Sequence, residues 1–183
     1  YLFYMARFDE SIAEINRAHE LDPVSLSIST EMGSPYYYMR QYDTALEKYT
    51  EAHEMDPGFP LAVYCMALCY GQKSQFNQAI GLLGRGKGGH SPTGAVGYFY
   101  GMSGHPKEGR EVLSDLMKID FPPTNIARVF VGLGEKEQAL LWLERAIDQR
   151  DERAVMLKVD PHFDSLRSDP RFRNLLGRLG LDQ

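Results

Sequence analysis

The stretch GLLGRGKGG, which begins at Gly81, is the part of the sequence that most resembles a chemical motif. Gly81, Gly86 and Lys87 match the G-x-x-x-x-G-K portion of a phosphate-binding loop, but Gly88 stands where a Ser or Thr would bind Mg²⁺. From Gly84 onward the stretch also fits G-x-G-x-x-G. Both motifs need a preceding strand, whereas these residues follow a helical pattern. We interpret them as a helix end and a turn, because glycine disfavours helix interiors.

Cysteine and histidine are the other candidates for chemistry. Cys65 and Cys69 lie four residues apart with no C-x-x-C pair beside them, so we interpret them as small buried hydrophobes. His19 and His53 share one repeat position, predicted on the surface, without the close spacing of a zinc site. No nucleophile has a recognisable base partner in the sequence. We therefore predict no enzyme activity, no metal and no cofactor.

Composition restricts the class of protein further. The 183 residues are 43% hydrophobic, which suffices for a core. A net charge of −5 disfavours a nucleic-acid partner, because phosphate contacts require a basic surface. No apolar run is long enough to span a bilayer, and two cysteines suit a reducing compartment. These features predict a soluble, cytoplasmic protein without a membrane partner.

The chain is built on an internal repeat. AHELDP at residues 18–23 returns as AHEMDP at residues 52–57, a step of 34 residues. Small residues mark the same frame five times, at steps of 34, 34, 30 and 30 residues: Ser11, Ala45, Ala79, Gly109 and Ala139. Residues four and seven positions after each marker are mostly apolar or small, which predicts one face of a helix.

The first half of each repeat predicts a second helix. Twelve positions before the marker stands a small residue, and an aromatic residue follows three positions later, as in Gly33 and Tyr36. The small residue allows two helices to approach closely, and the ring fills the space beside them. Asp-Pro after AHEL and AHEM predicts the end of a helix, with Leu21 and Met55 closing the core.

The order of small residue, aromatic, turn, Ala and Asp-Pro resembles the tetratricopeptide repeat (TPR). The resemblance implies an all-α, right-handed superhelical solenoid of antiparallel helix pairs. It covers residues 1–150 as five units, of which the first is truncated and the third and fourth are shorter. We expect residues 151–183 to form a C-terminal capping segment. Its final amphipathic stretch contains Phe172, Leu175, Leu176 and Leu179.

The resemblance extends to the tails of TPR arrays in bacterial and archaeal multidomain proteins, where the array follows a DNA-binding, cyclase or kinase domain. Tyr1 falls about ten residues into the first unit, in the frame of the repeat, so we expect the chain to be a module of a larger protein.

The concave face of a helical solenoid is where we expect a partner segment to bind. Chaperone-binding TPR domains use Lys and Asn there to clamp a terminal carboxylate, and these are absent. The predicted groove is aromatic and apolar with one cation, although some of its rings could be ordinary repeat packing. Its residues are Tyr37, Tyr38, Leu61, Tyr64, Leu68, Tyr98, Phe121 and Arg128.

The predicted function is a non-catalytic scaffold that binds an apolar protein or peptide segment. The alternative is a ligand-sensing or autoinhibitory module of a transcription regulator, cyclase or kinase. We also expect self-association through the N-terminal end, where Ile12 and Ile15 are incompletely covered. Pro35 lies within a predicted helix, so we expect that helix to persist with a kink between residues 31 and 35.

Overall fold

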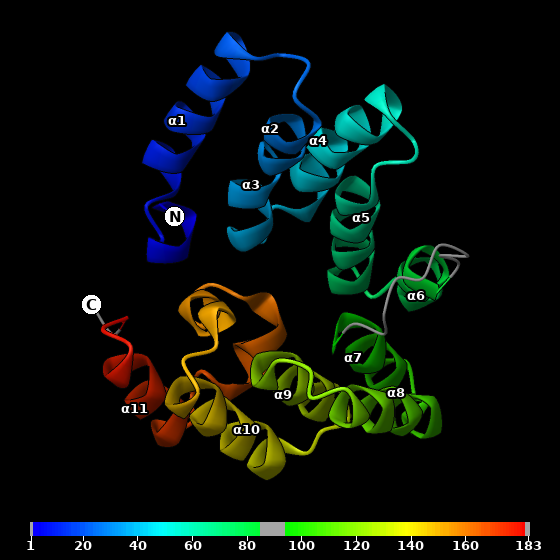
Figure 1. Cartoon of the computed structure of the whole chain (residues 1–183), viewed down its shortest axis with the longest axis vertical. Coiled ribbons are helices and arrows are strands. Elements are labelled where there is room, and N and C mark those ends of the chain that lie inside the picture. The colour runs from blue at the N-terminus through cyan, green and yellow to red at the C-terminus, as the bar shows by residue number, and fades with distance from the viewer. Residues whose placement is uncertain (1, 85–93, 182–183) are drawn as a thin grey trace. The chain divides into compact units, whose positions relative to one another are not determined.

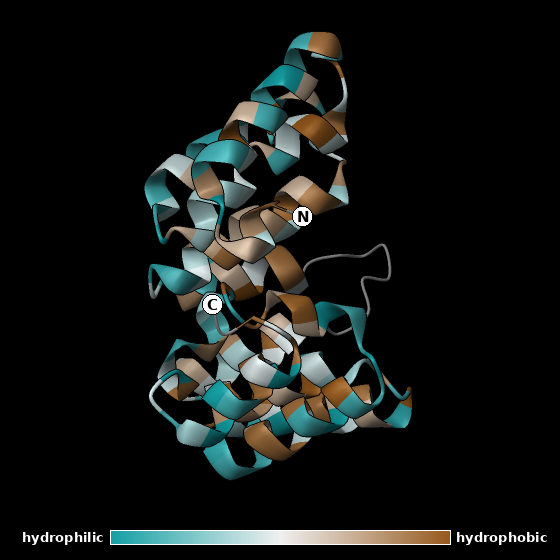
Figure 2. Cartoon of the chain, turned by 90° about the vertical axis from the view of Figure 1, so that its left-hand side faces the viewer, coloured by the Kyte–Doolittle hydropathy of each residue, from teal (hydrophilic) through white to brown (hydrophobic). Residues whose placement is uncertain are grey.

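The computed structural model describes residues 2–84 and 94–181, which form helices and turns and contain no strand (Figure 1). The predicted all-α fold is therefore confirmed. The chain divides into two compact units, Tyr1–Arg85 and Gly86–Gln183. Hydrophilic and hydrophobic residues alternate along the ribbons of individual helices, as expected of amphipathic helices (Figure 2).

The first unit contains three helix pairs of the predicted repeat. Its elements are, in chain order, the short 3₁₀ helix η1 (Leu2–Met5), α1 (Phe8–Leu21), α2 (Leu26–Glu31), α3 (Ser34–Tyr38), α4 (Tyr42–Met55), α5 (Pro60–Gln72) and α6 (Phe76–Gly84). The α4 helix packs against α2, α3 and α5, and α5 packs against α6. Each pair is therefore joined to the next through helices that are neighbours in the sequence.

The second unit contains two helix pairs and the C-terminal segment. Its elements are α7 (Gly94–Met102), α8 (Pro106–Lys118), α9 (Pro123–Gly132), α10 (Lys136–Asp148), η2 (Glu152–Met156), η3 (Pro161–Leu166) and α11 (Pro170–Arg178). The α9 helix is buried along its whole length, because α7, α10 and η3 all pack against it.

Burial confirms the repeat frame at its small residues. All five markers are buried, and so are the small residues twelve positions before four of them: Gly33, Ala67, Gly97 and Ala127. A Cβ atom at Gly33 would lie 2.5 Å from the Tyr49 ring, which shows why a glycine is needed there. One further frame position, Gly86, lies outside the described residues, as do Lys87, Gly88 and Gly89 of the glycine-rich stretch.

The turns inside the helix pairs repeat as well. Each has one residue with a positive φ angle, five positions before the marker: Ala6, Arg40, Ser74, Gly104 and Gly134. Only the last two are glycines, the residue that adopts this conformation without a steric cost. The turn geometry is thus imposed by the helix pairing rather than by local sequence preference.

The Asp-Pro steps end helices as predicted. Asp22 and Asp56 are the C-caps of α1 and α4. The expectation that Leu21 and Met55 close the core is wrong, because these side chains are 81% and 46% exposed. Each is the last residue of its helix, so no further helical turn flanks its side chain.

Pro35 interrupts its helix at the predicted place. The α2 helix ends at Glu31 and α3 begins at Ser34, so the predicted persistence of one kinked helix is wrong. Met32 and Gly33 between them keep right-handed helical angles, and Tyr36 remains helical. The interruption follows from the proline, which lacks the N–H group that would bond to the Glu31 carbonyl.

The C-terminal segment ends in the predicted amphipathic helix. Phe172 and Leu175 of α11 are buried, while Leu176 and Leu179 are half-buried. The α11 helix packs on α10, and Arg171 and Arg178 of α11 pair with Glu137 and Glu144 of α10. In both pairs the partners are 34 residues apart, so α11 continues the step of the first repeats.

Two glycine substitutions test this packing. Gly97→Ala should lower the free energy of unfolding by about 1–3 kcal/mol, because the new Cβ would lie 2.7 Å from Val129. Gly81→Ala in α6 meets no atom within 4 Å and should raise it by about 0.5–1 kcal/mol. Urea unfolding followed by far-UV circular dichroism measures both. Equal effects of the two substitutions would contradict the proposed close approach at Gly97.

Candidate functional site

The predicted groove residues fall on both units. Those of the first unit are Tyr37, Tyr38, Leu61, Tyr64 and Leu68, and those of the second are Tyr98, Phe121 and Arg128. The structure places the two groups in different surroundings, so each is described within its own unit.

In the first unit the groove residues surround an aromatic cluster. Tyr37 and Tyr49 are buried in its centre with Cys65 and Cys69 of α5. The half-buried side chains packed against this centre include Tyr36, Tyr38, Tyr42, Leu46, Tyr64, Met66 and Leu68. Tyr37 therefore belongs to the core, whereas Tyr38, Tyr64 and Leu68 keep part of their surface exposed.

Leu61 is the most accessible of the predicted residues on this unit. It lies in the first turn of α5 and is 37% exposed. Tyr64 and Leu68 follow at spacings of three and four residues, and both are half-buried. Such spacing places the three side chains on one stripe of α5.

Residues of η1 complete the aromatic surface beside Tyr38. The Phe3 ring stacks on the Tyr38 ring at 5.2 Å between centroids, and Tyr4 meets it edge-on at 6.1 Å. Burial raises the pKa of Tyr4, and the nearby Glu31 carboxylate adds to this. Sequence reasoning missed both residues. The signal was present, since they precede a turn at Ala6 that matches the turn at Arg40.

The cysteines behave as the predicted small hydrophobes. Both are free thiols and buried. Burial raises the pKa of Cys65 far above its ordinary value and that of Cys69 to about 12. Because the thiolate is the reactive form, these groups are unsuited to nucleophilic chemistry near neutral pH. They contribute apolar packing against Tyr49 and Tyr37.

In the second unit, the C-terminal segment covers the predicted groove positions. Arg128 of α9 is 6% exposed and donates from Nη2 to Asp160 Oδ2 at 2.9 Å. Its Nη1 donates to Asn125 Oδ1 at 3.1 Å. The backbone N–H of Thr124 donates to Asp151, which also belongs to the C-terminal segment. The cation expected to face a partner is therefore committed to an internal carboxylate.

Tyr98 is covered by the same segment, whereas Phe121 is half-buried just before α9. The Tyr98 ring is 8% exposed and meets the His162 ring edge-on at 4.7 Å. Burial raises the pKa of Tyr98 to about 12, and the Asp160 carboxylate contributes. Tyr98 thus serves as a wall of a buried polar cluster.

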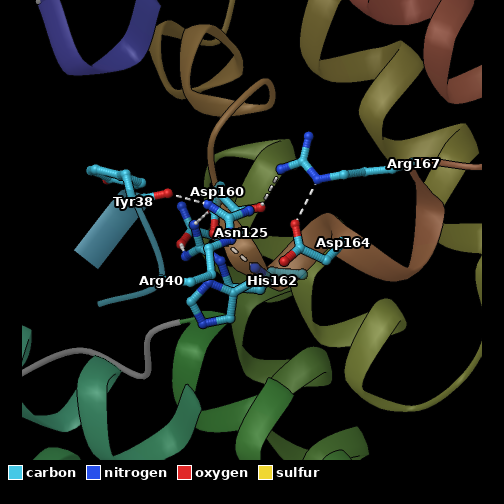
Figure 3. Close-up of polar contacts among 8 residues, drawn as sticks. Tyr38, Arg40, Asn125, Asp160, His162, Asp164 and Arg167 are labelled. Atoms are coloured by element: carbon cyan, nitrogen blue, oxygen red, sulfur yellow. Dashed lines mark hydrogen bonds and ion pairs between the residues drawn. The ribbon is translucent and has the colours of Figure 1, made fainter. Parts of the chain in front are cut away.

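Asp160 is the centre of that cluster. Besides Arg128, its carboxylate accepts from the backbone N–H of His162 at 3.0 Å and contacts His162 Nδ1 at 2.7 Å. Its carbonyl oxygen accepts from Arg167, which also donates to Asp164 (Figure 3). As the N-cap of η3, Asp160 fixes the start of the segment that covers α9. Sequence reasoning missed Asp160 and His162, although an Asp-Pro step preceded His162.

Electrostatics keep this cluster in one protonation state. Burial alone would raise the pKa of Asp160, but His162 and the Arg128 guanidinium outweigh burial and hold it well below its usual range. Burial lowers the pKa of His162, so its neutral imidazole donates Nδ1–H to Asp160. His162 Nε2 is buried without a hydrogen-bond partner. A pair with 2% exposure cannot meet a substrate, so we assign it a structural role.

The described part of the chain offers no metal site. Within residues 2–84 and 94–181, no group of three or more His, Cys, Asp or Glu could hold a metal ion. His19 and His53, predicted at the surface, are half-buried on α1 and α4. Among these same residues, every helix is too short or too polar to cross a bilayer.

Solved structures decide the type of fold. No protein-family model matches the sequence, and no curated protein matches it. A thermophilic TPR protein of Thermus thermophilus, TTC0263, is 15% identical and superposes with a TM-score of 0.66 over 88% of this chain and 93% of its own. This chain has a TPR fold.

Two crystal structures of MamA are also similar, each 18% identical with a TM-score of 0.52. They cover 80% and 81% of this chain, and 91% and 86% of their own. At these identities the likeness establishes the TPR fold alone. The groove and its partner must be argued from this chain's own side chains.

Removing the central carboxylate tests the buried cluster. Asp160→Asn should lower the free energy of unfolding by about 3–5 kcal/mol, because it leaves the Arg128 charge buried without its partner. Asp164→Asn is the matched control, since Asp164 is exposed and its ion pair with Arg167 should contribute about 0–1 kcal/mol. Chemical unfolding of both variants gives the comparison. Similar losses would contradict a central role for Asp160.

The cluster also predicts a pH dependence. The pKa of His162 is lowered on folding, so stability should fall as pH drops through about 6.5, where the unfolded histidine takes up a proton. The pKa of Asp160 is lowered too, so stability present above about pH 4 should be lost in more acidic solution. Urea titrations at pH 8, 5 and 3 measure this. His162→Gln should flatten the first step and Asp160→Asn the second, and unchanged profiles would reject the assignment.

Proposed function

We propose that this protein is a non-catalytic scaffold that binds an apolar segment of a partner protein on its first unit. The contact surface would be the α5 stripe of Leu61, Tyr64 and Leu68, with Tyr38 of α3 beside it. This proposal keeps four of the eight groove residues predicted from the sequence.

The contrast between the two units supports this choice. On the second unit, Tyr98 and Arg128 are buried by the C-terminal segment. On the first unit, Leu61 is 37% exposed, and Tyr38 and Tyr64 are half-buried against the aromatic cluster. Partly exposed aromatic and leucine side chains over a rigid core are suited to act as binding anchors.

The chemistry of this surface favours an apolar partner over an acidic tail. Its four side chains are neutral, and the nearby Arg40 donates to the Tyr38 carbonyl oxygen. Lys73 at the end of α5 pairs with Asp43 of α4. These cations have internal partners, so a carboxylate clamp has no support here.

The regulatory alternative has one observation in its favour. Asp160 and His162 occupy the predicted groove positions of the second unit, as an internal ligand would. A module whose own segment fills its groove could hold or release a neighbouring domain. The complete burial of Phe163 and Leu166 in that segment weighs against easy release.

Two further features of the proposed scaffold concern its surroundings. Exposed Leu21 and Val24, together with half-buried Ile12 and Ile15, support self-association through the N-terminal end. Both cysteines are buried free thiols, which supports a cytoplasmic location.

Substitution on α5 tests the proposed surface. A partner is first identified by crosslinking and mass spectrometry, and its contact segment is synthesised and titrated by calorimetry. Tyr64→Ala should weaken binding by about 2 kcal/mol, as the loss of an aromatic anchor does. Leu61→Ser should weaken it less, because Leu61 is already 37% exposed in the isolated chain.

The control is Val24→Ser, a substitution at a 78% exposed residue of the same unit outside the α5 stripe. It should leave the affinity unchanged. Unchanged affinity for Tyr64→Ala as well would reject this surface. Loss of the helical circular dichroism signal in Tyr64→Ala would instead assign the ring to the core.

A further inference from the structure

The second unit has a cleft that does not include any of the predicted groove residues. It lies between α10 and α11, which pack against each other, and has a volume of about 270 Å³. Its lining consists of Glu137, Leu140, Leu141, Glu144, Arg171, Asn174 and Leu175. Nothing in the repeat frame requires a cleft at this place.

Ion pairs hold the two helices beside the cleft. Arg171 donates to both carboxylate oxygens of Glu137, at 2.5 and 2.8 Å. Seven residues further along both helices, Arg178 lies 3.6 Å from Glu144. Because the pairs follow one another in the same direction, α10 and α11 run parallel. The cleft between them is therefore preformed rather than dependent on a ligand.

Leucines line the cleft between these pairs. Leu140 and Leu175 are each only 5% exposed, whereas Leu141 is 57% exposed. An apolar side chain placed against Leu141 would remove apolar surface of both molecules from water, which is favourable. The cleft is smaller than the roughly 300–1,000 Å³ of sites for small molecules. It accommodates one or two side chains of a protein segment.

The charges at the cleft determine what such a segment should carry. Arg171 is shared by Glu137 and Asp169. Arg178 has its nearer partner in Asp148, at 2.7 Å, so Glu144 holds the longer contact at 3.6 Å. Glu144 is exposed and lies one helical turn after Leu141. A cation on an incoming segment would complement Glu144 while an apolar neighbour covers Leu141.

We propose that the cleft between α10 and α11 binds a basic amphipathic helix of a partner protein. A leucine- or methionine-sized side chain of that helix lies against Leu141, and a Lys or Arg one turn away pairs with Glu144. Helices commonly bind grooves of this kind through apolar anchors three or four residues apart. This site is separate from the proposed surface on the first unit and does not depend on it.

The experiment selects peptides on the full 183-residue chain. A phage-displayed library of random peptides, each long enough for about four helical turns, is enriched for binding, and the selected sequences are read. We expect apolar residues spaced by three or four positions, with Lys or Arg among them. One selected peptide is then synthesised and titrated against variants by fluorescence anisotropy.

Leu141→Ala should weaken binding of that peptide about tenfold, as truncation of a contact anchor does. Glu144→Gln should weaken it by about threefold and reduce its dependence on salt, because an exposed charge pair is lost. Leu21→Ala and Glu14→Gln on α1 are matched controls at exposed positions and should leave the affinity unchanged. Circular dichroism verifies that every variant remains helical.

Several results would overturn the proposal. These are the absence of any enriched peptide, enrichment of acidic peptides, and peptides that bind Leu141→Ala as tightly as the unmodified chain. Peptides sensitive to Tyr64→Ala but not to Leu141→Ala would support the first unit's surface and reject the cleft. Light scattering that shows a dimer abolished by Leu141→Ala would identify the occupant as a second copy, against the partner proposed here.

Discussion

Close approach of helices at small buried residues is the constraint on which this structure depends. At Gly33 the Tyr49 ring occupies the space of a Cβ atom, and at Gly97 the Val129 side chain does so. Larger side chains at these places would separate the helices and expose the aromatic residues that fill the space beside them. The Tyr37 and Tyr49 core of the first unit, and the complete burial of α9 in the second, both follow from these short distances.

The features that recur along the chain could be predicted from the sequence. Ala45 and Ala139 are buried because the same pattern of small residues was visible in each repeat. The positive φ angles at Arg40 and Ser74 could not be foreseen, since these residue types seldom adopt that conformation. The exposure of Leu21 was missed for a different reason: helical periodicity assigns a face but does not show where the neighbouring helix ends.

The candidate site was less predictable than the fold. The repeat frame placed Arg128 and Tyr98 on one face, yet their partners Asp160 and His162 lie beyond the last repeat, where no periodic signal exists. The residues of α5 were easier, because their spacing alone places Leu61, Tyr64 and Leu68 on one stripe. Sequence periodicity thus predicts surfaces, while the segment that covers a surface must be seen in the structure.

The buried ion pair between Arg128 and Asp160 has a consequence for the order of folding. Helix pairs are joined by contacts between sequence neighbours, so they can form as soon as each pair is synthesised. Asp160 follows Arg128 by 32 residues, so the guanidinium stays hydrated until η3 docks. Both charges then lose water together, in a single late step that completes the core around α9. During synthesis, the second unit therefore passes through a stage with α9 uncovered, when chaperones have access to it.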